Sequence, residues 1–317
     1  MKQKQKQKVE TLDYYVVKAL DFIKKQGNLT VKLPKRAYTL VVGSQSGLLA
    51  GRIIYRFAGR SFSHAKEVLA QPEIDAKRKI ITDVTIVSAS GSRQVIPIAS
   101  YALEKGFRVN AITCRKKSKL KAVLGNKIKY IVLPTTEEPP TVNTVTYGMM
   151  IQAITHENVS KIKRVVKSLK EPKGGYGQFK AFTVIFTDRM PEVAEMVDWK
   201  LRGEKIGRCI GTMSTHLTNF MHGAGVNDAK KKKELYIALG LSKKEKRVFD
   251  QVFEKVPEER KHYIDVPNDF GPLGYMMVGY SVVGQIQKNY PDFQKKIGIY
   301  AQRAKEWEWL SPLCDKK

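Results

Sequence analysis

The sequence predicts an α/β protein with two halves, each built around a mostly parallel β-sheet covered by helices. Short β-branched, apolar runs alternate with longer segments of helical spacing, and this alternation occurs twice along the chain. Between the two series lies KEPKGGYGQ, residues 170–178, whose charges, proline and three glycines are typical of a linker. With 317 residues, of which 42% are hydrophobic, the chain can form two ordinary cores.

The first half begins with a basic tail, residues 1–8, which we expect to be flexible, and continues as a domain over residues 9–170. The spacing of apolar residues distinguishes its predicted helices from its predicted strands. Apolar residues recur about every 3.6 residues in a helix that packs on a core, whereas a buried strand is a short continuous apolar run. The predicted strands are 38–43, 84–88, 108–113 and 128–133. The predicted helices are 9–25, 48–57, 95–105, a short one near Leu120, and one or two helices over 144–169.

The second half follows a linker that we place at residues 171–178 and runs over residues 179–317, including a C-terminal helix and tail. Its plan is the same as that of the first half. The predicted strands are 181–187, 235–239 and 262–266, and the predicted helices are 191–202, 243–255 and 273–289.

The chain is strongly basic, with 57 Lys and Arg against 30 Asp and Glu, a formal net charge of +27. Such a charge attracts polyanions. Aromatic residues are not interleaved with the basic runs as stacking on single-stranded nucleic acid requires, so we expect only non-specific nucleic-acid binding. The basic runs are residues 2–8, 115–121, 230–233 and 243–247.

Several classes of protein are excluded by motifs that the sequence lacks. Cys114, Cys209 and Cys314 lie far apart, without C-x-x-C or clustered histidines, so we expect neither disulfides nor a metal. No G-x-G-x-x-G or P-loop pattern is present, so we expect no nucleotide cofactor. Without a signal-type segment or a run of about 18 apolar residues, the expected location is the cytoplasm, away from membranes.

Three loops that follow predicted strands of the first half contain the residues expected to bind phosphate. GSQSG (43–47) and SASGSRQ (88–94) have small side chains that let the backbone approach an anion, and TCRKKSKL (113–120) adds cations. Each loop alone also fits ordinary helix capping. Because all three loops follow strands of one parallel sheet, we expect them to lie at the same edge of that sheet. Together they therefore favour a phosphate pocket. The candidate phosphate-binding residues are Ser44, Ser46, Ser88, Ser90, Ser92 and Arg93.

These loops and the helix after them resemble the sugar isomerase (SIS) domain over residues 38–135. The resemblance rests on Ser88 to Gly91, the helix through Gly106, the AIT of residues 111–113 and the Ser118/Leu120 pair. GSQSG is similar to the same family's first phosphate loop. The resemblance implies two SIS-type, flavodoxin-like, three-layer αβα domains, a phosphorylated sugar as ligand and a homodimer.

The second half resembles the second SIS domain more faintly. TDRMPEVAEMVDWKLRGEKIG is similar to the helix with the family's catalytic glutamate, NFMHG (219–223) to its Glu-x-x-His-Gly, and PLGYMMVGYSVVGQIQKNYPDF to its C-terminal helix. The resemblance implies aldose–ketose isomerisation of a hexose or aminohexose 6-phosphate, with or without deamination. Glu204 is the expected base and His222 the expected ring-opening group; Glu195 is the alternative base and His216 the second candidate histidine.

Two departures keep another function open. Arg93 stands where the family has a threonine, so it either strengthens the phosphate site or blocks it. Glu204 lies one residue away from its expected spacing, which turns a helical side chain by about 100°. The alternative is therefore a protein that binds or senses a sugar phosphate without turnover; nucleic-acid binding ranks below it. Weaker expectations for substrate contact are Thr144, Thr146 and Lys296.

Overall fold

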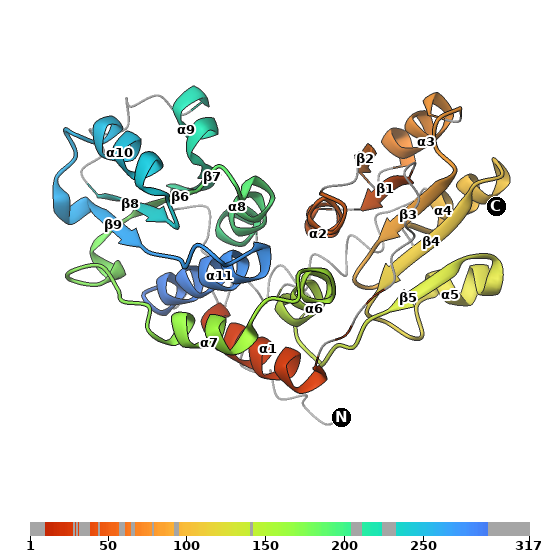
Figure 1. Ribbon diagram of the computed structural model, residues 1–317, viewed down its shortest axis with the longest axis horizontal. Helices are drawn as coiled ribbons and strands as arrows, with labels where there is room; N and C mark the ends of the chain where they lie inside the picture. The colour runs from red at the N-terminus through yellow and green to blue at the C-terminus, as the bar shows by residue number, and fades with distance from the viewer. Residues whose placement is uncertain are drawn as a thin grey trace, which may run out of the picture. The chain divides into compact units, whose positions relative to one another are not determined.

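The fold of the chain comes from a computed structural model and consists of two compact units (Figure 1). The five-stranded unit comprises residues 19–137 and 143–158, and the four-stranded unit comprises residues 1–18, 138–142 and 159–317. The structure describes residues 10–27, 29, 31, 39–43, 45–56, 61–64, 67–77, 79–91, 95–139, 142–203, 211–223 and 233–290.

The five-stranded unit contains a parallel sheet of order β2-β1-β3-β4-β5. Its strands are β1 (Thr39–Gly43), β2 (Ser61–His64), β3 (Asp83–Val87), β4 (Arg108–Thr113) and β5 (Lys129–Val132). Its helices are α2 (Ser46–Ile54), α3 (Glu67–Ala76), α4 (Ile96–Glu104), α5 (Lys119–Leu124) and α6 (Thr144–Thr155).

Every residue of β1 and β3 is buried, because helices cover both faces of this sheet. Helices α3, α4 and α5 pack on one face around a core that includes Leu40, Val42 and Ile86. Helices α2 and α6 cover the other face, in agreement with their placement in Figure 1. At Gly51 a β-carbon would lie 2.7 Å from Cγ1 of Val41, so glycine allows α2 to pack close to the sheet.

The four-stranded unit contains a second parallel sheet, of order β7-β6-β8-β9. Its strands are β6 (Ala181–Phe186), β7 (Gly211–His216), β8 (Glu234–Leu239) and β9 (Lys261–Ile264). Its helices are α7 (Val159–Lys167), α8 (Pro191–Asp198), α9 (Leu217–Gly223), α10 (Lys243–Val252) and α11 (Pro272–Lys288).

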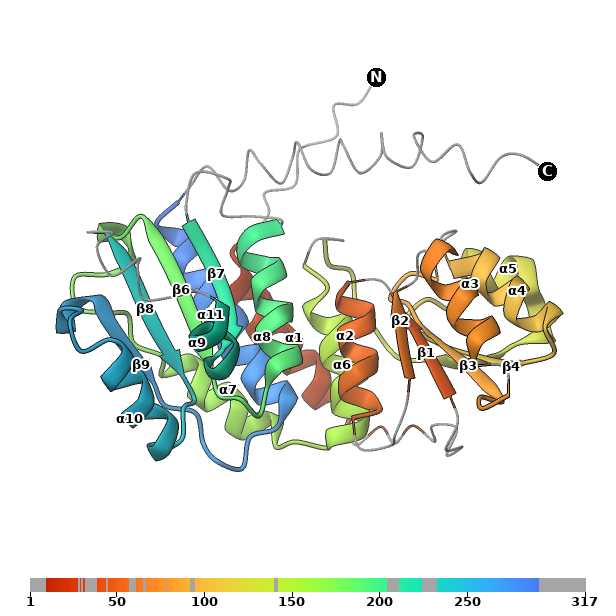
Figure 2. The same cartoon turned by 90° about the horizontal axis from the view of Figure 1, so that it is seen from above.

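The second sheet is also covered on both faces. Helices α9 and α10 share a core with Ile185, Tyr236 and Ala238, whose side chains point to one face of β6 and β8. Helices α8 and α11 pack on the other face; Figure 2 shows α11 behind the strands. A β-carbon on Gly279 would lie 2.7 Å from Val197 and 3.0 Å from Phe186, so this glycine allows the close packing of α11.

Helix α1 (Leu12–Gln26) is anchored to α11 at its first turn. The buried Leu12 N–H donates a 2.8 Å hydrogen bond to Oε1 of Gln287. Asp13 forms an ion pair of 2.5 Å with Lys288. Helix α7, which precedes the predicted linker, packs on α11 as well.

The predicted fold class, α/β with two mostly parallel sheets flanked by helices, is confirmed. The segment 144–169 forms two helices, because His156 ends α6 with a left-handed φ of 51°. The predicted helix 191–202 is α-helical to Asp198 and then widens into a π-turn at Trp199–Gly203. The sequence prediction omitted β2, α3, β7 and α9. Within the described segments, no helix combines the length and the apolar character that crossing a membrane requires.

Candidate functional site

The switch point of the five-stranded sheet lies between β1 and β3. From β1 the chain goes to β2 on one side, whereas from β3 it goes to β4 on the other, and the loops after β1 and β3 enter helices on opposite faces. Gly43 and Val87, the last residues of the two strands, are register partners. Open parallel sheets bind ligands at the carboxyl ends of strands at such a point. The loops predicted to bind phosphate therefore occupy the position that the topology favours.

The loop after β1 turns tightly into α2. Gln45 has a φ of 45°, and half-buried Ser46 is the first residue of the helix. A β-carbon on Gly43 would lie 2.5 Å from the backbone nitrogen of Leu48, and one on Gly47 would lie 2.7 Å from the carbonyl oxygen of Val87. Both glycines are required by this packing, which places Ser46 beside the end of β3.

A hydrogen bond to the side chain of Ser88 holds the loop after β3 in a tight turn. The Gly91 N–H donates a 3.1 Å hydrogen bond to Oγ of Ser88, and Gly91 has a φ of 54°. Ser88 and Ser90 are half-buried, so neither residue is closed off from solvent. The structure thus brings Ser46, Ser88 and Ser90 to the same edge of the sheet.

The loop after β4 is hydrogen-bonded to the loop after β3. The Cys114 N–H and the Thr113 hydroxyl both donate to the carbonyl of Ala89, at 3.3 and 3.2 Å. The Leu120 N–H donates to the carbonyl of Gly91 at 3.1 Å. These bonds fix two neighbouring loops at the carboxyl edge of the sheet.

Thr144 and Thr146 lie in the first turn of α6, close to α2. Both are buried, with exposed fractions of 0% and 6%, and Oγ1 of Thr146 lies 3.4 Å from Oγ1 of Thr135. A β-carbon on Gly47 would lie 4.0 Å from the hydroxyl of Tyr147, so the starts of α2 and α6 meet. The predicted substrate contact of the two threonines stays a prediction.

A second polar cluster lies at the carboxyl edge of the four-stranded sheet. Oδ1 of Asp188, just after β6, lies 3.0 Å from Nδ1 of His216, the last residue of β7. Asp188 also accepts hydrogen bonds from the N–H and the hydroxyl of Thr218, at 2.8 and 2.6 Å. Burial would raise the pKa of the Asp188 carboxyl, but the hydrogen bonds from Thr218 and His216 outweigh burial and lower that pKa.

The carboxylate of Glu245 accepts hydrogen bonds from the loops after β6 and β8. The donors are the Thr187 hydroxyl at 2.8 Å, the Asp188 N–H at 2.8 Å and the Ser242 N–H at 2.7 Å. Burial would raise the pKa of Glu245, but the bonds from Ser242, Asp188 and Thr187 lower it. The chain's own carboxylate therefore occupies the Asp188 and Ser242 N–H groups at this edge of the sheet.

Tyr275 connects this edge to α11. Its hydroxyl donates to the carbonyl of Gly240 at 3.1 Å and receives a 3.2 Å hydrogen bond from Arg189. Gly240 has a φ of 61°, and a β-carbon there would lie 2.3 Å from the Tyr275 ring. Burial raises the pKa of the Tyr275 hydroxyl, so it stays protonated and can donate.

The remaining predicted site residues are either exposed or outside the described part of the chain. His222 on α9 and Glu195 on α8 are both exposed. The other predicted site residues, Glu204, Ser44, Ser92, Arg93 and Lys296, lie outside the described residues. In the described part of the chain, no three His, Cys, Asp or Glu side chains gather as a metal would require.

Sequence reasoning missed Asp188, Thr218 and Glu245. A usable signal for Asp188 was its place two residues after a buried strand, where ligand-binding side chains are common. Its pairing with His216 had no signal, because the strand that ends at His216 was not predicted.

Comparison with solved structures shows the fold of tandem SIS domains. Glucosamine-6-phosphate deaminase from Thermotoga maritima superposes with a TM-score of 0.60 at 16% identity, covering 87% of this chain and 94% of the other. The C-terminal domain of glucosamine-fructose-6-phosphate aminotransferase from Francisella tularensis gives 0.58 at 10% identity, with coverages of 90% and 95%. Tagatose-6-phosphate ketose/aldose isomerase from Escherichia coli gives 0.54 at 12% identity, with coverages of 88% and 87%.

The chain therefore shares its fold, at low sequence identity and over most of its length, with a deaminase, a ketose/aldose isomerase and a domain of an aminotransferase, all named for sugar phosphates. No family model matches the sequence, and no curated protein matches it.

Proposed function

We propose that the chain binds a hexose or aminohexose 6-phosphate at the carboxyl edge of the five-stranded sheet and isomerises it between aldose and ketose. The observation that carries this proposal is the meeting of the Ser46 turn and the Ser88–Gly91 loop at the β1/β3 switch point. Serine hydroxyls and backbone N–H groups hold the phosphate there, together with Ser44, Ser92 and Arg93. Held at this end, the sugar presents its reacting carbons in a fixed orientation.

Isomerisation requires a base that removes a proton from the carbon next to the carbonyl and returns it to the neighbouring carbon. We propose Glu204 for this role, with Glu195 as the alternative. It also requires a group that opens the sugar ring. His216 is better supported than His222, because Asp188 orients its ring through Nδ1 and leaves Nε2 for proton transfer.

A second candidate function is binding of the same sugar phosphate without turnover. Its support is the exposure of Glu195 and His222, since an acid–base group of an isomerase works in a partly desolvated site.

Incubation of the full chain with glucosamine 6-phosphate and with glucose 6-phosphate, followed by measurement of fructose 6-phosphate and ammonia, separates these functions. Formation of fructose 6-phosphate from either substrate supports isomerisation, and ammonia release from the amino sugar adds deamination. Saturable binding of both compounds without any product selects the non-catalytic protein. A Glu204→Gln variant that retains full turnover would exclude that residue as the base.

A further inference from the structure

The loop between β4 and α5 carries more positive charge than one phosphate needs. Its residues 115–119 include Arg115, Lys116, Lys117 and Lys119, and we call this segment the basic loop. All four cations are exposed. The surrounding sequence from 105 to 136 has nine Lys or Arg residues and no Asp or Glu. Within the described part of the chain, no carboxylate forms an ion pair with any of the four cations.

The basic loop is held against the candidate phosphate loop. A β-carbon on Gly91 would lie 2.6 Å from Cβ of Ser118, and Gly91 accepts a hydrogen bond from the N–H of Leu120. On the other side, Cys114 donates to the carbonyl of Ala89. Lys117 and Lys119 flank Ser118 directly. Their long side chains therefore start beside the Ser88–Gly91 loop.

The negative charge of a sugar monophosphate is smaller than the positive charge of the basic loop. A phosphate monoester carries about −1.5 to −2 at neutral pH, whereas the four side chains carry a formal charge of +4. Neighbouring cations repel one another and are stabilised by a bound polyanion. Charge-assisted hydrogen bonds from Arg and Lys to phosphate or carboxylate are stronger than hydrogen bonds between neutral groups. The surplus indicates a ligand with a second anionic group.

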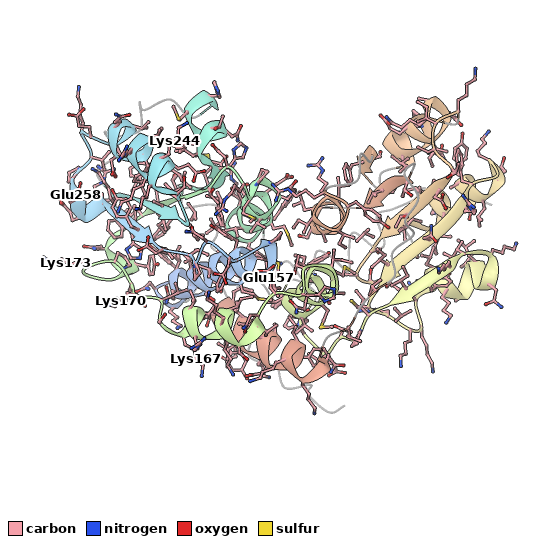
Figure 3. The ribbon with its side chains drawn as sticks, in the orientation of Figure 1. Glu157, Lys167, Lys170, Lys173, Lys244 and Glu258 are labelled. Atoms are coloured by element: carbon pink, nitrogen blue, oxygen red, sulfur yellow. The ribbon has the colours of Figure 1, made fainter. Side chains whose placement is uncertain are left out.

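Other exposed lysines do not have this setting. Lys167, Lys170 and Lys173 project outward from the four-stranded unit in Figure 3. They lie at the end of α7 and on the segment between α7 and β6. This segment follows a helix and not a strand, so the three lysines represent an ordinary solvated surface.

From this arrangement we propose that the basic loop recognises a second phosphate or carboxylate on the sugar phosphate held by the Ser88–Gly91 loop. The ligand class is a doubly anionic sugar, such as a sugar bisphosphate or a phosphorylated sugar acid. This inference rests on the proposed function, because the first phosphate must occupy the Ser88–Gly91 loop. It extends that function by specifying which sugar phosphates bind most tightly.

Titration calorimetry of the full chain tests the inference with fructose 6-phosphate, fructose 1,6-bisphosphate and 6-phosphogluconate. Each doubly anionic ligand is compared with the monophosphate, and the readout is the ratio of the dissociation constants. In the unmodified chain we expect the better of the two to bind at least about tenfold more tightly, which corresponds to one strong charge-assisted contact. Which of the two binds better separates a second phosphate from a carboxylate.

The loop variant is K116Q/K117Q, and its matched control is K127Q/K129Q. The control removes the same charge from exposed residues near the start of β5, at the opposite edge of the sheet. We expect the affinity ratio to fall to about twofold or less in the loop variant and to stay near tenfold in the control, because salt-screened charges act over short distances.

Four outcomes have distinct meanings. A collapse of the ratio in the loop variant alone supports the inference. A ratio near one in the unmodified chain, or a ratio kept in the loop variant, overturns it and leaves the proposed function standing. No binding of any of the three ligands overturns the proposed function itself. A short oligothymidylate that binds more tightly than these ligands, and that the loop variant no longer binds, overturns the inference in favour of nucleic acid.

Discussion

Gly91 and Ser118 lie so close together that a β-carbon on the glycine would be 2.6 Å from Cβ of the serine. Real β-carbons do not approach this closely, and Gly91 also has a φ of 54°, which side chains of L-residues rarely adopt. This contact sets the distance between the candidate phosphate loop and the basic loop.

Gly91→Ala is therefore expected to displace the loop after β3, to lower stability by about 1–3 kcal/mol and to weaken sugar-phosphate binding at least about tenfold. The matched control is Gly125→Ala, since Gly125 has a φ of 51° but open space around it. Urea unfolding and calorimetry measure the two effects. Equal losses in both variants would show that the backbone angle, and not the contact with Ser118, is responsible.

His216→Gln is expected to lower kcat about 100-fold, which is the usual loss when a positioned acid–base group is removed. Asp188→Asn should also lower kcat, because the imidazole ring of His216 loses the carboxylate that orients it. His222→Gln serves as the matched control, with the same change on an exposed residue. The reverse pattern, a large loss only in His222→Gln, would return the ring-opening role to His222.

Acid is expected to destabilise the four-stranded unit through Asp188 and Glu245. Both carboxyls have lowered pKa values in the folded chain. Their contribution to stability is present above their ordinary pKa values, near 4, and is lost as the pH falls through the lower folded values. Unfolding measured between pH 7 and pH 3 should show a shallower loss of stability in Glu245→Gln than in the unmodified chain. Glu254→Gln, on an exposed residue, should leave the slope unchanged.

Gln287→Met is expected to cost about 1–3 kcal/mol, because it leaves the buried Leu12 N–H without its acceptor. The substitution conserves the shape of the side chain, so the loss reports the hydrogen bond more than the packing. Gln251→Met, at an exposed position of α10, is the control and should change stability by less than about 0.5 kcal/mol. Equal stability of both variants would exclude this bond as the anchor of α1.

The sequence allowed the central strands to be predicted, because they are buried on both faces and form continuous apolar runs. β1 and β6 are examples, with TLVVG and AFTVIF. β2 and β7 were missed, and both are edge strands. Their sequences, SFSH and GTMSTH, are mostly polar, so they have no apolar run to mark them.

The same distinction applies to the candidate site. The Ser88–Gly91 loop could be predicted, because its small residues directly follow a recognisable strand. The pairing of Asp188 with His216 could not, because it depends on β7 lying beside β6, where Phe186 and His216 are register partners. Two residues 28 positions apart meet only once that edge strand is known.

The central claim is that the five-stranded unit binds a sugar through its phosphate, and the most direct test is the melting temperature of the full chain with added ligands. Fructose 6-phosphate and glucosamine 6-phosphate at millimolar concentration should each raise the melting temperature, since a ligand of the native state stabilises it by RT ln(1 + [L]/Kd). Fructose and glucosamine without phosphate should have no effect. Equal melting temperatures with and without both phosphorylated sugars would contradict the account.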